Sequence, residues 1–281
     1  MTQKNDQVWF ITGANKGMGA AIAKEALGRG YKVVATARNP ESAGKILGNF
    51  PNLLIAKLDI TNDEQVQSAV KAALDRFGRI DVLVNNAGYA LLGFFEETSE
   101  KLIRQQIETN VFGTMKVTRA VLPFMRKQGF GLVIVFSSAS GIRAVGGSSM
   151  YSASKFALEG WTEGMSIDLK PFGIRCMLVE PGPFRTDFSN VKTSLTFSDL
   201  EIDDYKQQRE MMYNTFVSLN QKQPGDPAKL AKALMTAVNA SNPPLRLLAG
   251  KAAVGAIYQY LDARRSEYEA WHEVSASTDF D

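Results

Sequence analysis

The 281-residue chain has only one cysteine, Cys176, and only one histidine, His272. A single cysteine excludes an internal disulfide, a zinc site built from several cysteines and a CxxC redox motif. With one histidine, a Ser-His-Asp hydrolase or a histidine-ligated zinc enzyme is also hard to build. We therefore expect no metal site and none of these chemistries.

The chain also lacks a strong charge bias and a long apolar run. Its 32 basic and 29 acidic side chains give a formal net charge of +3, too small to favour nucleic acid or a membrane surface as a partner. No apolar run approaches the roughly 18 residues of a membrane-spanning helix, and Met1–Asp6 is polar, unlike a secretory signal. These absences predict a cytoplasmic protein that binds neither nucleic acid nor membrane.

The residues that are present have the composition of a globular protein, with 45% hydrophobic and 22% charged residues. Short β-branched runs alternate with longer helical patterns, and most of these runs are apolar throughout, as expected for parallel strands covered on both faces. Such alternation predicts an α/β fold with a doubly wound parallel sheet, and no composition break divides residues 1–281 into domains. The expected strands are Val8–Thr12, Lys32–Ala37, Leu53–Lys57, Val82–Asn85, Leu132–Phe136, Ile174–Glu180 and Arg246–Leu248. The expected helices are about Gly17–Arg29, Glu41–Leu47, Asp63–Phe77, Ser99–Arg126, Ser149–Lys170 and Pro227–Asn239.

One long segment, Phe188–Pro224, interrupts this alternation between the sixth strand and the next helix. Long connections in compact domains are usually lids or binding loops, so residues 188–224 are predicted to be a substrate-binding insertion. The alternative is a pair of surface helices that merely packs against the domain.

A glycine-rich turn follows the first strand and opens the first helix. Glycines spaced G-x-x-x-G-x-G let the chain turn sharply and let the backbone approach a pyrophosphate, which the helix N-terminus would bind. A purely structural turn is the alternative, but the placement between strand and helix favours a dinucleotide site. The turn supplies the predicted cofactor-binding residues Gly13, Asn15, Lys16, Gly17, Met18 and Gly19.

The end of the second strand indicates which dinucleotide is bound. An acidic residue there would bind the ribose 2′-hydroxyl of NAD, whereas an arginine would accommodate the 2′-phosphate of NADP. Here Ala37 stands where a carboxylate would be, Arg38 follows, and Lys16 lies in the glycine turn. We expect NADP(H) rather than NAD(H), unless both cations are simply solvated surface residues.

Tyr151 and Lys155 lie four residues apart at the start of a predicted helix, and thus on one face. A lysine cation about 4 Å from the phenol, at an effective dielectric of about 20, is worth roughly 4 kcal/mol. This interaction is predicted to lower the phenol pKa by up to about three units from its ordinary value near 10, making the pair an acid or base at neutral pH. Taken alone, the Y-x-x-x-K spacing would fit two helix-surface residues equally well.

Two further polar residues support the interpretation of Tyr151 and Lys155 as a catalytic pair. Ser138 follows a central strand, at the edge where ligands bind in open α/β sheets, and its hydroxyl could hold a substrate carbonyl. Asn110 is a poor helix former inside a predicted helix. It could connect Lys155 to a water chain, or it could bond to its own backbone.

In this order and spacing, the chain resembles the classical short-chain dehydrogenase/reductases from Val8 to about Leu248. The residues that carry the resemblance are the turn from Thr12 to Gly19, Asp59, Asn85-Asn86-Ala87-Gly88, Asn110, Ser138, Tyr151, Lys155 and Pro181-Gly182. The resemblance implies a Rossmann-type sheet of about seven strands and hydride transfer between a nicotinamide and a ketone or aldehyde. The basic residues Lys16 and Arg38 match the NADP-preferring branch of the family. The sequence around Tyr151 resembles that of hydroxysteroid dehydrogenases and carbonyl reductases.

The resemblance also assigns roles. Tyr151 would donate the proton, Ser138 would orient the carbonyl, Asn110 would support the lysine and its water relay, and Lys155 would bind the nicotinamide ribose and lower the phenol pKa. Thr186 would lie near the nicotinamide carboxamide and phosphate. The other cofactor contacts implied by the resemblance are Asp59, Ile60, Asn86, Ala87, Gly88, Pro181, Gly182 and Phe184.

The substrate is less well defined. Ser138, Tyr151, Val145 and Phe188 are the predicted substrate contacts, and Phe94 and Phe95 could join them in an apolar pocket, although aromatics at such places are more often core. Family members are commonly homodimers or homotetramers, and a symmetric assembly is expected here as well. Two other functions stay open: a non-catalytic NADP(H)-binding regulatory or scaffold protein, and an epimerase or dehydratase using the same tyrosine and lysine.

Overall fold

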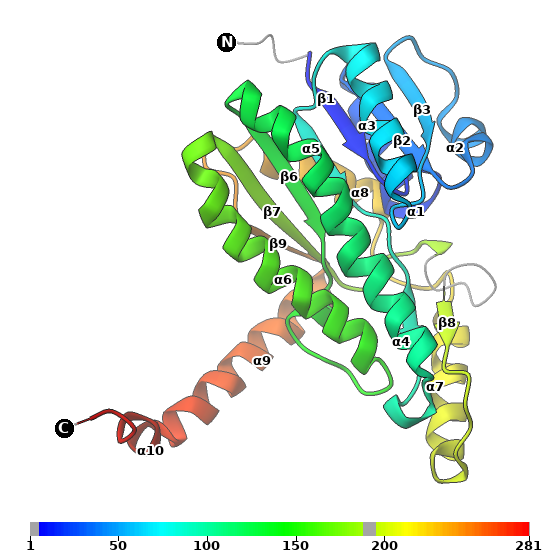
Figure 1. Cartoon of the computed structure of the whole chain (residues 1–281). Helices are drawn as coiled ribbons and strands as arrows, with labels where there is room; N and C mark the ends of the chain where they lie inside the picture. Colours follow the sequence, from blue (N-terminus) through cyan, green and yellow to red (C-terminus); the bar gives the residue numbers. More distant parts are fainter. Residues whose placement is uncertain (1–5, 188–194, 281) are drawn as a thin grey trace.

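The computed structural model describes residues 6–187 and 195–280, and their centre is a seven-stranded parallel sheet (Figure 1). The strands run in the order β3-β2-β1-β4-β6-β7-β9. Chain order therefore reverses between β1 and β4, where a crevice opens at the carboxyl ends of the strands. The predicted doubly wound sheet of about seven strands is confirmed. The strands are β1 (Val8–Ile11), β2 (Lys32–Ala37), β3 (Leu53–Lys57), β4 (Val82–Asn85), β6 (Gly131–Phe136), β7 (Ile174–Pro181) and β9 (Arg246–Ala249).

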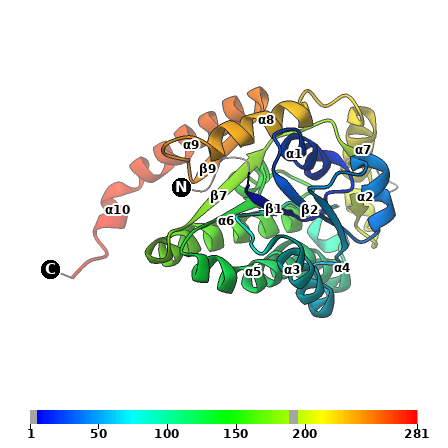
Figure 2. The same cartoon turned by 90° about the horizontal axis from the view of Figure 1, so that it is seen from above.

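Helices cover both faces of the sheet, as the view along the layers shows (Figure 2). Successive side chains of each strand point to opposite faces, so Trp9 and Ile11 enter one core whereas Val8 and Phe10 enter the other. This is why the strands are apolar at nearly every position. The helices of the first face are α1 (Gly17–Gly28), α2 (Pro40–Leu47) and α8 (Pro227–Val238), and those of the second are α3 (Asp63–Phe77), α5 (Thr114–Gln128) and α6 (Ser149–Leu169).

Side-chain caps start three of these six helices, α2, α3 and α8. Asn62 accepts a hydrogen bond from the Gln65 amide (2.9 Å) at the start of α3, and Asp226 accepts one from the Ala228 amide (2.8 Å) at the start of α8. Helix α1 differs, because its N-cap residue Lys16 makes no side-chain cap and its first turn holds no acidic residue. The first amides of α1 therefore have no capping side chain.

The predicted single helix Ser99–Arg126 is wrong. The structure has α4 (Glu100–Ile107), a π-helical segment (Glu108–Gly113) and then α5. Hydrophobic periodicity cannot reveal an inserted π turn, because the flanking α-helical patterns continue on either side. Such turns are frequent at functional sites, and this one carries Asn110.

A second, two-stranded parallel sheet lies beside the main one. It joins β5 (Ala90–Leu92) to β8 (Leu195–Phe197), two strands that the sequence did not predict. Each has three residues, too few for a recognisable pattern, and their pairing depends on contact between distant segments. Strand β8 and helix α7 (Lys206–Leu219) belong to the insertion predicted at 188–224.

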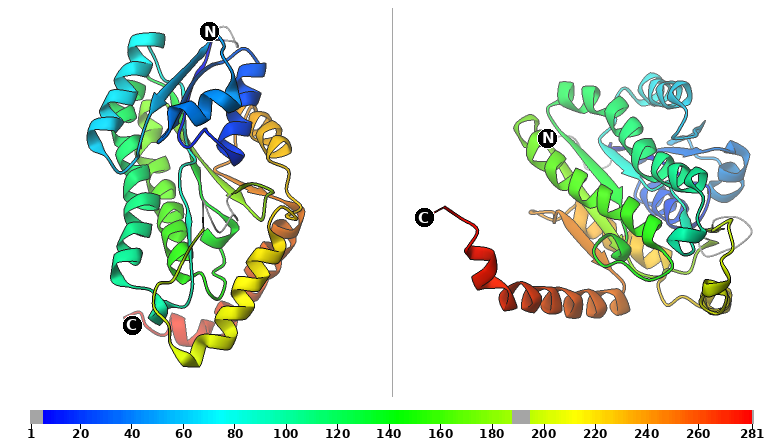
Figure 3. Two further views of the ribbon diagram at one scale, coloured as in Figure 1. Left: turned by 90° about the vertical axis from the view of Figure 1, so that its right-hand side faces the viewer. Right: turned by 60° about the horizontal axis from the view of Figure 1, so that its bottom comes forward.

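The chain ends in α9 (Lys251–Ala270) and α10 (His272–Ala276), which extend away from the domain (Figure 3). Only Ala253 and Ile257 of α9 are buried. None of the described helices combines the length and the apolar character that crossing a bilayer requires.

Candidate active site

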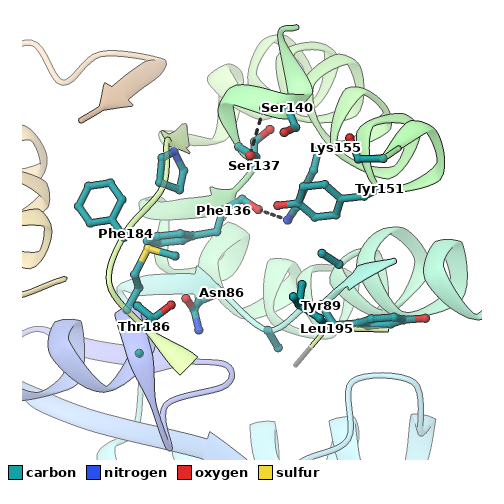
Figure 4. Close-up of a pocket in the computed structure, with 18 of the residues that line it drawn as sticks. Asn86, Tyr89, Phe136, Ser137, Ser140, Tyr151, Lys155, Phe184, Thr186 and Leu195 are labelled. Atoms are coloured by element: carbon teal, nitrogen blue, oxygen red, sulfur yellow. Dashed lines mark hydrogen bonds between the residues drawn. The ribbon is translucent and has the colours of Figure 1, made fainter. Parts of the chain in front are cut away.

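A cavity of about 1390 Å³ lies at the carboxyl ends of the central strands. The glycine turn, the ends of β4 and β6, the start of α6 and the segment after β7 surround it (Figure 4). Residues of β8 and α7 line one side of it. The structure brings most of the predicted site residues to its walls: Gly13, Asn15, Lys16, Gly17, Met18, Arg38, Asp59, Ile60, Asn86, Ala87, Gly88, Ser138, Val145, Tyr151, Lys155, Pro181, Gly182, Phe184 and Thr186.

The glycine turn has the close packing that its sequence suggests. Gly13 and Gly17 have φ of +66° and +55°, in the left-handed region that favours glycine. A Cβ at Gly19 would lie 2.4 Å from the Gly13 oxygen and 2.5 Å from the Asn86 amide nitrogen. Gly19 is buried and does not line the cavity, and its lack of a side chain allows helix and turn to pack closely; its cofactor contact stays a prediction.

Asn86 joins this turn to the end of β4. Its side-chain Nδ2 donates to the carbonyl oxygens of Thr12 (2.9 Å) and Gly13 (3.2 Å). The Thr12 hydroxyl in turn accepts the backbone amides of Asn86 and Ala87, each at 3.0 Å. These bonds fix the position of the turn relative to the central strand.

The segment after β7 approaches the same turn from the other side. Thr186 is 7% exposed, and a Cβ at Gly17 would lie 3.3 Å from its Cβ. Phe184 is buried, and Gly182 donates its amide to the Ala249 oxygen at 2.9 Å. The predicted Pro181–Thr186 segment thus forms one wall of the cavity opposite the glycine turn.

Two cations lie at the outer end of this crevice. Arg38 is exposed at the end of β2, beyond the buried Ala37. Burial lowers the pKa of Lys16, the charge of Asp187 raises it, and the charge of Arg38 lowers it further. The two cations therefore repel each other, and an anion between them would relieve that repulsion.

The catalytic candidates meet at the inner end of the cavity (Figure 4). The Nζ of Lys155 lies 5.7 Å from the centroid of the Tyr151 ring and donates to the Phe136 oxygen at 2.8 Å. The Ser138 hydroxyl makes a hydrogen bond with Tyr151 and accepts the Ser140 amide at 3.1 Å. Phenol, ammonium and serine hydroxyl thus converge from α6 and the end of β6.

The predicted lowering of the phenol pKa is wrong. Burial raises the pKa of Tyr151 to about 12, and the hydrogen bond from Ser138 offsets only part of this rise. Burial also lowers the pKa of Lys155 to about 8, against the charge of Glu159, which raises it. Removal from water outweighs the attraction between the phenolate and the ammonium, so Tyr151 keeps its proton at neutral pH.

Asn110 lies behind these residues and not in the cavity wall. Its side-chain Nδ2 donates to the Tyr89 oxygen (3.0 Å) and to the Ser154 hydroxyl (3.1 Å), and its Oδ1 accepts the Tyr89 amide (3.1 Å). A Cβ at Gly88 would lie 3.0 Å from Asn110 Oδ1 and 3.9 Å from Lys155 Nζ. Asn110 therefore connects the strand end beside the lysine to helix α6, and the alternative that it bonds only to its own backbone is wrong.

The part of the cavity beside Tyr151 is mainly apolar. Leu92, Leu195, Met212 and Phe216 line it together with the predicted Val145, whose exposed fraction is 58%. The predicted contact Phe188 lies outside the described residues.

The expected contribution of Phe94 and Phe95 is wrong. Phe94 stacks on Tyr205 with ring centroids 4.8 Å apart, Phe95 is 62% exposed, and neither lines the cavity.

Sequence reasoning missed several features of this site, two of which lie next to the catalytic candidates. Tyr89 lines the cavity directly after the Asn-Ala-Gly segment, and its position in the sequence could have indicated this. The Phe136 carbonyl that holds Lys155 carries no side-chain signal, so only the fold could reveal it.

Comparison with known proteins agrees with this geometry. The profile of the short chain dehydrogenase family matches residues 7–195. An oxidoreductase of Botryotinia fuckeliana, BOA17, is 33% identical over 278 residues, covering 97% of this chain and 99% of its own. The 3-ketodihydrosphingosine reductase of Bacteroides thetaiotaomicron is 34% identical over 251 residues, covering 87% and 88%.

Solved structures give the same result. A short-chain dehydrogenase from Streptomyces avermitilis superposes with a TM-score of 0.88 at 40% identity, over 98% of this chain and 99% of its own. A short chain dehydrogenase from Burkholderia cenocepacia, solved in complex with NADP, gives 0.71 at 28% identity, over 94% and 96%. The chain belongs to the short-chain dehydrogenase family and is an oxidoreductase of that type.

Proposed function

We propose that this protein is an NADPH-dependent reductase of ketones or aldehydes, running in reverse as an alcohol dehydrogenase. The observation that carries the proposal is the convergence of Tyr151, Ser138 and Lys155 on the inner end of the cavity. A proton donor, a second hydroxyl and a fixed cation lie where a carbonyl oxygen would need all three.

The protonation states of Tyr151 and Lys155 suit the reduction of a carbonyl group. A nicotinamide cofactor, when bound, supplies the hydride. Tyr151, with its pKa near 12, carries the proton that the substrate oxygen needs as negative charge develops on it, and an alkoxide is a stronger base than a phenolate. Lys155, with its pKa near 8, is mainly an ammonium at pH 7 and stabilises the phenolate that Tyr151 becomes. The Ser138 hydroxyl orients the carbonyl.

The glycine turn fits a dinucleotide phosphate. Without a side-chain cap on α1, the first amides of that helix are open to an anion, and the macrodipole favours one there. A cavity of about 1390 Å³ exceeds the roughly 300–1,000 Å³ of ordinary ligand pockets, which leaves room for a dinucleotide and a substrate together.

Arg38 and Lys16 support NADP(H) over NAD(H), because two neighbouring cations suit the 2′-phosphate and Ala37 offers no carboxylate to a 2′-hydroxyl. Because the Burkholderia cenocepacia relative was solved with NADP and a Burkholderia phymatum relative with NAD, the proposed preference rests on Arg38 and Lys16.

We further propose that residues 188–224 act as a lid over the substrate end. The described part of this segment lines the cavity with Leu195, Met212 and Phe216, which suits a carbonyl compound with an apolar body. The Bacteroides thetaiotaomicron relative is named for reduction of such a compound. A homodimer or homotetramer and a cytoplasmic location stay predictions.

The decisive test replaces Tyr151 by phenylalanine, which removes the donor proton and keeps the ring. We expect turnover of NADPH with a panel of ketones and aldehydes to fall at least about 1,000-fold, while NADPH still binds with near-normal affinity in a fluorescence titration. Tyr258→Phe on the exposed face of α9 is the matched control. Turnover within tenfold of the wild type would refute the role of Tyr151.

The cofactor preference has its own test. Arg38→Ala should lower kcat/KM for NADPH by about 10- to 100-fold and leave that for NADH nearly unchanged, because only NADPH carries the 2′-phosphate. An equal loss for both cofactors, or a wild-type preference for NADH, would contradict the assignment. If NADPH binds but no carbonyl compound is reduced across a broad panel, the non-catalytic binding function is the better reading.

A further inference from the structure

A partly buried charge cluster lies between α6, β7 and β9. Arg246 of β9 places its Nε 3.3 Å from Glu159 Oε2 of α6 and 3.5 Å from Glu180 Oε1 of β7, and its Nη2 pairs with Glu163 at the outer end. Glu159 and Glu180 are 8% and 2% exposed. None of these four residues lines the cofactor cavity.

The charges in this cluster do not balance. Three carboxylates face two cations, the guanidinium of Arg246 and, beside Glu159, the ammonium of Lys155, and two of the three carboxylates are removed from water. Two buried carboxylates that face each other cannot both ionise without a large cost, so the pair retains a proton. Among the described residues, no donor makes a well-aligned hydrogen bond to Oε1 of Glu159 or to Oε1 of Glu180, which has only the 3.5 Å ion pair with Arg246.

The titration behaviour agrees with the geometry. Burial raises the pKa of Glu180 to about 7, and the charge of Glu159 raises it further against the attraction of Arg246. Burial also raises the pKa of Glu159, against smaller opposing contributions from the Ser137 hydroxyl and from Arg246. Both carboxyls therefore hold protons more tightly than an exposed glutamate does.

The cluster contacts the elements that carry the catalytic candidates. Glu159 lies one helical turn after Lys155 on α6, and its charge raises the pKa of that lysine. Its side chain and the Ser137 hydroxyl converge on Gly141, where a Cβ would lie 3.2 Å from Glu159 Cγ and 2.4 Å from Ser137 Oγ. Ser137 directly precedes Ser138, and its amide donates to the Val179 oxygen, next to Glu180.

A metal site does not explain the cluster. The Arg246 guanidinium occupies the position between the carboxylates, and in residues 6–187 and 195–280 no group of three His, Cys, Asp or Glu side chains is arranged to hold a metal ion.

We propose that Glu159 and Glu180 share one proton at neutral pH, and that this acid pair, held by Arg246, positions α6 and the end of β6 for catalysis. The catalytic part of this statement rests on the proposed function, and the proton sharing does not. Above neutral pH the pair loses its proton, two buried anions then face each other, and α6 is pushed away from β7. The charged groups that face the pair are Lys155 and Glu163 on α6 and Arg246 on β9; β6 contributes the neutral Ser137.

The first test needs no activity. Infrared spectroscopy of the wild type at pH 7 should show the carbonyl band of a protonated carboxylic acid, and Glu180→Gln should lose it. Glu269→Gln, which changes an exposed carboxylate on α9, is the control and should keep the band. Absence of the band from the wild type at pH 7, or its persistence in Glu180→Gln, would overturn the proton sharing.

Thermal unfolding supplies a second readout. Because the folded-state pKa of Glu180 is raised above its value in the unfolded chain, the stability that the bound proton confers is full below that unfolded value. It is lost as the pH rises through about 7. Between pH 5 and pH 8 the melting temperature of the wild type should therefore fall by about 5 °C relative to that of Glu180→Gln. Parallel curves for the two proteins would also overturn the proposal.

The positioning role is tested by the pH dependence of turnover. Glu180→Gln, which mimics the protonated acid, should keep kcat near neutral pH, leave the KM for NADPH unchanged and lose the step in kcat near pH 7. Glu180→Leu should lower kcat at least about tenfold, because it leaves Arg246 without that partner. An unchanged pH profile in Glu180→Gln would overturn the positioning role alone. If no carbonyl compound is reduced by the wild type, the proposed function fails, and the infrared and thermal results still decide the proton sharing.

Discussion

The glycine turn offers a sharp test of the geometry, the substitution Gly19→Ala. The added Cβ would lie 2.4 Å from the Gly13 oxygen and 2.5 Å from Asn86 Nδ2, both closer than carbon atoms tolerate. Because Asn86 Nδ2 also donates to the Gly13 oxygen at 3.2 Å, relief of the clash must separate these two groups. The change therefore strains the turn and weakens its attachment to β4.

The expected size of the effect follows from these contacts. Overpacking costs about 1–3 kcal/mol, and loss of the hydrogen bond adds about 1 kcal/mol, against a gain of about 1 kcal/mol from replacing glycine by alanine in a helix. We expect the free energy of unfolding to fall by about 2 kcal/mol in urea denaturation. The affinity for NADPH should fall at least about tenfold, because the strained turn no longer holds its backbone amides in the arrangement that binds a phosphate.

Gly28→Ala in the same helix is the matched control. Nothing lies within 4 Å of a Cβ at Gly28, so this variant should gain up to about 1 kcal/mol and bind NADPH normally. Equal stability and equal NADPH affinity in the two alanine variants would refute the packing argument, and with it the placement of the turn against Asn86.

Two further predictions concern the insertion and the catalytic lysine. Arg209→Met leaves Glu97, which is 0% exposed, without its cationic partner. The free energy of unfolding should therefore fall by about 3–5 kcal/mol in urea denaturation. Adding Glu97→Gln to this variant should restore most of the lost stability, because it removes the unpaired buried charge. A loss below about 1 kcal/mol would show that the pair does not anchor α7. In Glu180→Gln, which should lack the step near pH 7, the kcat/KM for ketone reduction should hold steady below pH 7 and decline above about pH 8, where Lys155 loses its charge while Tyr151 keeps its proton. A pH profile that stays level to about pH 10 would contradict the role of the Lys155 charge.

The sequence by itself determined the doubly wound sheet, because parallel strands buried on both faces need apolar residues at nearly every position, and β1 to β7 show them. It also placed most of the predicted site residues at one cavity, since turns and strand ends at one edge of a parallel sheet must meet. Tyr151, Ser138 and Arg38 were found in this way. A local sequence pattern is enough to predict a feature when all the residues that determine it lie in one strand, helix or turn.

The tertiary structure alone decided what depends on contact between distant segments. The pairing of β5 with β8, the π turn at Asn110 and the Phe136 carbonyl on Lys155 have no local pattern. The direction of the Tyr151 pKa shift also belongs here, because desolvation depends on everything that surrounds a group, whereas spacing along a helix reports only one neighbour. For the same reason no sequence pattern revealed the carboxyl pair of Glu159 and Glu180, which α6 and β7 bring together from separate parts of the chain.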